Sequence, residues 1–252
     1  MESKNQYLLI LGSTVFYAAS FLPHLSFLLL IFLVPLLILL DNNQRKLSLE
    51  WIGGMIITLV MGSVIGSIIA GQSIEFSQVL YPLGLVLILS IGIFISNLLK
   101  GSIRTIGLVG FWLGYNYLIL KLIPEWSSYF TFNHLYNDDM SWTSSTGFLG
   151  IACWALISNV LISKRISFDE KSKIDSPIVL LITLVIISAP FWISSILNSS
   201  SEPIDQATMF LLYSQTEGAG EYVQSGEWVA RTCASLAVLL SIYGLVRLKT
   251  TK

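Results

Sequence analysis

The residues with the most reactive side chains in this sequence are its two cysteines, Cys153 and Cys233, together with Arg231 and His134. Each cysteine is expected roughly 8–10 Å below the outer end of an apolar helix, at 1.5 Å per residue. A nearby arginine lowers the pKa of a thiol, and a histidine in the loop above would serve as a base. These residues support one alternative, a membrane enzyme that acts on lipid-linked substrates through Cys233, Arg231 and His134. Buried free cysteines are ordinarily small hydrophobic residues, so no catalytic residue is assigned.

Arg231 is the stronger candidate for binding. It lies about one turn inside the last apolar segment, where a guanidinium is costly unless it reaches the interface or pairs with a partner. Glu227 precedes it by four residues, which is the spacing of an ion pair on one helix face. Aromatic residues of the outer segments would complete a site for a lipid head group or another anion. The predicted site comprises Arg231, Glu227, Trp228, His134, Trp126 and Trp142.

The composition restricts the class of protein. The chain has 252 residues, of which 54% are hydrophobic and 12% are charged. This excess of apolar residues is typical of a polytopic membrane protein. Two cysteines without ligand spacing predict neither a disulfide framework nor a metal site. The net charge of −1 argues against a nucleic-acid partner. The absence of a glycine-rich phosphate loop argues against nucleotide-driven transport, and no cofactor is expected.

The chain should form an all-α integral membrane domain that covers residues 1–252. A membrane-spanning helix needs about 20 predominantly apolar residues, and about eight segments approach that length. Prolines inside such segments are tolerated where neighbouring groups satisfy the freed backbone atoms. The predicted spans lie near 6–21, 25–40, 51–71, 78–98, 103–121, 146–163, 177–197 and 228–246.

Basic residues predict the orientation of these spans. With the N-terminus in the cytoplasm, every lysine and arginine except Lys121 and Arg231 falls on the cytoplasmic side. This is the positive-inside pattern, and an even number of spans also places the C-terminus in the cytoplasm. Two long loops then face outward, 122–145 and 198–227, and their aromatic residues are expected to anchor at head-group depth.

Three sequence stretches resemble the membrane part of the apolipoprotein N-acyltransferase family. "LPHLSFLLLIFLVPLLILL" is similar to its early proline-containing hairpin, and "TGFLGIACWALISNVLI" is similar to its sixth helix. "EYVQSGEW" is similar to the tyrosine and glycine–acid–tryptophan that lead into its final helix. The resemblance implies a base of eight helices in the bacterial inner membrane and a role in lipoprotein biosynthesis.

The sequence departs from that family where the family carries its nitrilase-type catalytic domain. A self-standing domain seldom has fewer than about 50 residues, and the segment 198–227 is shorter and contains no cysteine or lysine. None of the family's catalytic Glu, Lys and Cys residues maps onto this chain. The leading hypothesis is therefore a membrane base without its own acyltransferase activity. It would bind phospholipid or lipoprotein, or serve as the membrane partner of a separate catalytic subunit on the outer face.

A second alternative is a structural assembly subunit that binds other helices. Gly54, Gly62 and Gly66 recur at four-residue spacing or its multiples within one apolar segment. Small residues at this spacing allow helix backbones to approach closely in lipid. The pattern predicts a helix-packing face, either within the chain or toward a partner.

Overall fold

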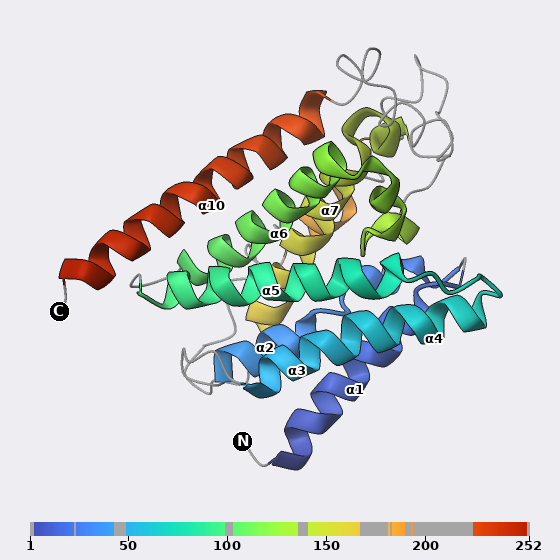
Figure 1. Cartoon of the computed structure of the whole chain (residues 1–252). Coiled ribbons are helices and arrows are strands. Elements are labelled where there is room, and N and C mark those ends of the chain that lie inside the picture. Colours follow the sequence, from blue (N-terminus) through green and yellow to red (C-terminus); the bar gives the residue numbers. More distant parts are fainter. Residues whose placement is uncertain are drawn as a thin grey trace.

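The computed structural model describes residues 3–22, 24–42, 49–98, 103–135, 141–166, 181, 183–189, 193 and 224–250. Within these residues the chain is all-helical (Figure 1), which confirms the predicted all-α class, whereas the eight spans and the cytoplasmic termini stay predictions. Most of the predicted span 177–197 and of the outer loop 198–227 lies outside the described residues. The described helices are α1 (Ser3–Ala19), η1 (Ser26–Leu30), α2 (Val34–Asn42), α3 (Leu49–Ile56), η2 (Ile57–Met61), α4 (Gly62–Ile69), α5 (Ser77–Leu98), α6 (Ile103–Leu122), η3 (Pro124–Tyr129), η4 (Asn133–Leu135), α7 (Ser141–Ile166) and α10 (Gln224–Thr250).

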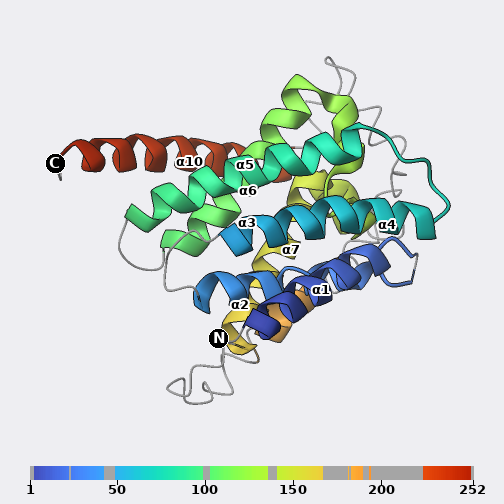
Figure 2. The same cartoon turned by 60° about the horizontal axis from the view of Figure 1, so that its bottom comes forward.

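Three described helical segments are long and apolar enough to cross a membrane, namely Leu49–Ile69, Ser77–Ile95 and Thr146–Arg165. Two shorter apolar helical segments, Ser26–Asp41 and Trp228–Gly244, accompany them. The helices form one bundle in which α1 and α10 lie on opposite sides (Figure 1). Helices α1 to α4 lie together, and α10 packs against α5, α6 and α7 (Figure 2).

The apolar segment 25–40 is not the continuous helix that its composition predicts. It divides into η1, which ends at Leu30, and α2, which begins at Val34. Pro35 lies in the first turn of α2, where its missing N–H and fixed φ are tolerated, and it prevents an unbroken helix from running through the preceding turn. The side chain of Asn159 on α7 enters the break. Its Oδ1 accepts from Leu33 N at 2.9 Å and its Nδ2 donates to Leu29 O at 2.8 Å. These two backbone groups would bond each other in an unbroken helix, so the Asn159 amide replaces a lost helical hydrogen bond.

The predicted glycine face packs against a helix of the same chain. A Cβ atom on Gly62 would lie 2.6 Å from Cδ1 of Tyr17, and one on Gly66 would collide with the ring of Phe21. Between these contacts and Gly54, the π-helical turn η2 places Thr58 against Thr14, with hydroxyl oxygens 3.2 Å apart. The small residues therefore allow close packing of α1 on the α3–η2–α4 helix.

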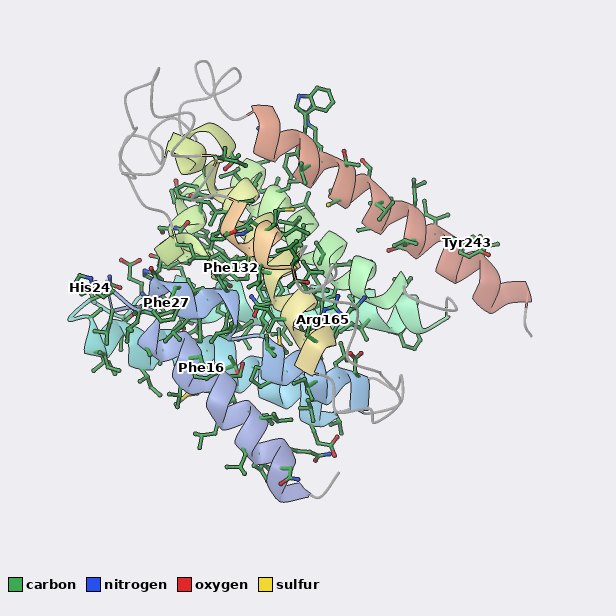
Figure 3. All side chains as sticks on the ribbon, turned by 180° about the vertical axis from the view of Figure 1, so that it is seen from behind. Phe16, His24, Phe27, Phe132, Arg165 and Tyr243 are labelled. Carbon is green, nitrogen blue, oxygen red and sulfur yellow. The ribbon has the colours of Figure 1, made fainter. Side chains whose placement is uncertain are left out.

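Part of the predicted outer loop 122–145 folds into the bundle instead of lying at its surface. Phe130 and Phe132 lie in the turn between η3 and η4 and are buried. The Phe132 ring lies 5.8 Å from Phe32 and 5.6 Å from Trp112, centroid to centroid, and its interior position is visible in Figure 3. The prediction that the aromatic residues of this loop act as interfacial anchors is wrong for Phe130 and Phe132. Both rings are buried inside the bundle, among rings of other helices.

Candidate functional site

Helices α6 and α10 approach each other closely along a face of small residues. A Cβ atom on Gly114 of α6 would lie 3.2 Å from Cα of Ala234 on α10, and one on Gly110 would lie 3.7 Å from the carbonyl oxygen of Cys233. Glycines four residues apart permit this approach. Continuing along the same face of α6, the next positions are Tyr117 and Lys121, because residues three and four apart are neighbours on a helix.

Lys121 and Arg231 are the two basic residues that the predicted orientation does not place on the cytoplasmic side. Both contact Tyr117 at this helix crossing. Arg231 Nε donates to the Tyr117 hydroxyl at 3.1 Å. Lys121 Nζ lies 5.9 Å from the centroid of the Tyr117 ring. The Arg231 guanidinium also lies 5.9 Å from the ring of Trp228. Both separations are within the range of cation–π attraction, so Tyr117 holds two positive charges at one end of the α6–α10 crossing.

An apolar groove of about 740 Å³ runs between α5, α6 and α10. Its walls include Leu118 one residue after Tyr117 and Ala234 three residues after Arg231. Along α10 the groove continues to Ile242, next to the exposed Tyr243 (Figure 3). Cations about one helical turn from the lining of an apolar groove match the two parts of an anionic lipid, a charged head group and acyl chains.

The other predicted members of the head-group site lie in different environments. Trp228 is 63% exposed and contacts Arg231. Trp126 is partly buried against the core. The backbones of Glu227 and Trp142 are helical, but their side chains lie outside the described residues, so the predicted pair between Glu227 and Arg231 stays a prediction.

His134 lies in a different environment from Arg231. Its ring packs on Phe21 with centroids 4.1 Å apart, and it lines a cavity of about 390 Å³. The described residues of this cavity come from α1, α4, α5, η3, η4 and the α4–α5 connection, and none comes from α10. His134 and Arg231 therefore have separate sets of described contacts.

The cysteines are placed as packing residues. Cys153 on α7 and Cys233 on α10 are both free thiols of intermediate exposure, and both pack against the hydrophobic core. The described contacts do not bring Cys233 to the cavity that His134 lines. The arrangement therefore supports the interpretation of both cysteines as small hydrophobic residues.

Burial of His134 predicts a pH dependence of stability. Burial lowers its pKa from 6.5 to about 4, so the unfolded chain binds more protons than the folded chain between these values. Stability should consequently fall as the pH drops from about 6.5 to about 4. We expect a loss of roughly 2 kcal/mol from this group, because the ring retains some exposure.

The measurement is thermal unfolding in detergent at pH 7 and pH 4.5. The variant His134→Gln should lose this part of the acid destabilisation, whereas His24→Gln should keep it, since His24 is exposed. His24 is the chain's other histidine and is seen at the edge of the bundle in Figure 3. Equal acid sensitivity of the two variants would contradict the prediction.

Two residues of the cation site were not singled out from the sequence. These residues are Lys121 and Tyr117. The available signal was the series Gly110, Gly114, Tyr117 and Lys121, which recurs on one helix face. A small-residue pair followed by an aromatic and a cation on the same face indicates a packed helix with a polar end.

A comparison of the chain with protein-family models, curated proteins and solved structures finds no match.

Proposed function

We propose that the chain is a membrane protein that binds an anionic phospholipid in the groove between α5, α6 and α10. The observation that carries the proposal is that Arg231 and Lys121 both contact Tyr117, about one helical turn along α10 and α6 from the groove residues Ala234 and Leu118. The lipid phosphate would lie at the two cations, and an acyl chain would lie against Leu118 and Val238.

Charge and apolarity support an amphipathic lipid over a soluble anion. Charge-assisted hydrogen bonds from arginine to phosphate are among the strongest hydrogen bonds in proteins. Each buried CH₂ group of an acyl chain adds about 0.8 kcal/mol. A soluble anion would use only the cations and leave the apolar groove without a role.

The wider assignment of the chain rests on the sequence. With eight spans and both termini in the cytoplasm, the Arg231 end of α10 would lie in the outer leaflet of the bacterial inner membrane. The resemblance to the membrane part of the apolipoprotein N-acyltransferases supports a role beside lipoprotein biosynthesis. The bound lipid would then be presented to a lipoprotein or to a separate outer-face catalytic subunit.

Native mass spectrometry of the purified full-length protein tests the proposal. The double variant Lys121→Gln/Arg231→Gln should retain at least tenfold less phosphatidylglycerol than the wild type, because it loses two charge-assisted contacts of about 1.5–3 kcal/mol each. Each single variant should show a smaller loss.

Two matched variants serve as controls. Lys164→Gln removes an exposed cation from α7, and Cys233→Ala removes a thiol from α10 close to Arg231. Both should bind phosphatidylglycerol as the wild type does. Unchanged lipid retention in a double variant that unfolds at the wild-type temperature would overturn the proposal. Loss of a measurable acyl or peptide transfer in a normally expressed Cys233→Ala variant would instead favour the enzyme alternative.

A further inference from the structure

The groove between α5, α6 and α10 has an inner wall of small residues on α10. Ala234, Ala237 and Ser241 line it at spacings of three and four residues, so they share one face of that helix. Ala237 is buried, whereas Val238 of the same lining is 58% exposed and borders the open side of the groove. The inner face of α10 therefore borders the groove without filling it.

Two aromatic rings of α6 line the same groove and are held against α5. A Cβ atom on Gly92 of α5 would lie 2.5 Å from Cδ2 of Phe111, and one on Gly84 would collide with the hydroxyl of Tyr115. Each ring therefore rests on a glycine of α5. Between the two rings on α6, Gly114 lines the groove and adds no side chain to it. The open volume of about 740 Å³ remains between these helices.

The lining of the groove offers few polar groups to a ligand. Of its three described hydroxyl groups, that of Tyr115 donates to Tyr81 O at 3.1 Å, and that of Ser241 donates to Ala237 O at 2.7 Å. None of the described lining residues carries a charge. A buried polar ligand group without a hydrogen-bond partner is costly, and an acyl chain needs no such partner. The lining therefore suits an acyl chain.

The cations that would select the head group lie outside this lining. Arg231 and Lys121 contact Tyr117, and none of the three belongs to the described residues that line the groove. They lie about one helical turn from the groove residues Ala234 and Leu118. Contacts with a head group and contacts with an acyl chain would therefore come from different residues, which can be changed separately.

We infer that recognition at this site has two separable parts, in which the groove binds an acyl chain of any phospholipid and the cations select an anionic head group. Ala237, Val238 and Ser241 then determine whether a chain fits. The inference rests on the proposed lipid site and names the residues that give it capacity for a chain. A zwitterionic phospholipid consequently also occupies the groove, with lower affinity than an anionic one.

The test is native mass spectrometry of the full chain released from nanodiscs. The nanodiscs contain equal amounts of phosphatidylglycerol and phosphatidylcholine with identical acyl chains. The wild type should retain both lipids, with phosphatidylglycerol in excess. Lys121→Gln/Arg231→Gln should lose this excess, because the head-group contacts are removed. It should still retain phosphatidylcholine within twofold of the wild type, because its groove is unchanged.

Filling the groove should give a different pattern. Val238→Trp adds an indole to the lining, and it should reduce the retention of both lipids at least tenfold, because the space for the chain is lost. Its matched control is Val246→Trp, the same substitution on the same helix at a valine that is 54% exposed and is not among the described residues of the groove. The control should retain both lipids within twofold of the wild type.

A second variant keeps the test decisive if the indole of Val238→Trp turns away from the groove. Ala237→Leu enlarges a buried residue of the lining and should also reduce the retention of phosphatidylcholine. Wild-type retention in both Val238→Trp and a folded Ala237→Leu would overturn the inference. Where Ala237→Leu does not fold, wild-type retention in Val238→Trp alone would overturn it, and so would an equal loss of lipid in Val246→Trp.

The inference and the proposed function fail in different ways. Equal retention of the two lipids by the wild type, with loss of both in Val238→Trp, would contradict selection by the cations and support the groove as the acyl-chain site. An excess of phosphatidylglycerol that depends on Lys121 and Arg231 but persists undiminished in the groove-filling variants would support the cation site and contradict the inference.

Discussion

Replacing Asn159 with leucine is expected to destabilise the protein by about 3–6 kcal/mol. The Asn159 side chain is fully buried and bridges Leu33 N and Leu29 O. Its Nδ2 also donates to Ala155 O at 2.8 Å on its own helix. Leucine has a similar volume but no polar atoms, so two backbone groups would remain buried without partners in an apolar interior.

Thermal or urea unfolding of the purified protein measures this effect. The matched control is Ser158→Ala, one residue away. Ser158 is equally buried, but its hydroxyl has no hydrogen-bond partner in the described part of the chain. The control should therefore unfold within about 1 kcal/mol of the wild type. Similar stabilities of Asn159→Leu and Ser158→Ala would show that the broken helix does not depend on the Asn159 amide.

Replacing Gly62 with leucine should cost about 3–5 kcal/mol, more than an ordinary overpacked core position. The new side chain would collide with the ring of Tyr17. Two other aromatic rings hold the Tyr17 ring in position. Tyr17 stacks on Phe32 with centroids 5.0 Å apart and meets Phe21 edge-on at 5.6 Å. The rings cannot move away from the new side chain without disturbing each other, so α1 would be displaced from the α3–η2–α4 helix.

Gly53→Ala is the control for Gly62→Leu, because a Cβ atom on Gly53 meets no atom within 4 Å. Alanine also favours a helix over glycine by about 1 kcal/mol, so this variant should be as stable as the wild type or more so. Unfolding in detergent is the measurement. A Gly62→Leu protein of wild-type stability that loses a bound partner would instead support the helix-binding alternative.

The helical class and the packing face followed from local patterns in the sequence. Apolar segments approaching the length of a membrane span predict helices without knowledge of the fold, because each helix satisfies its own backbone in lipid. Gly62 and Gly66 lie on one face through helical spacing alone, so their role in close packing could be predicted. The identity of the packed helix could not, because several apolar helices would fit such a face.

The sites depended on contacts between distant parts of the chain. Arg231 and Tyr117 are 114 positions apart, and Asn159 is 126 positions from the Leu33 amide that it binds. Residue spacing fixes neighbours only within a helix, and the side chains that meet across helices depend on the crossing geometry. The sequence by itself therefore determined that this is an apolar helical chain with two basic residues set apart. Only the tertiary structure decided that Arg231 and Lys121 share one tyrosine while His134 lines a separate cavity, because long-range packing alone determines which helix ends meet.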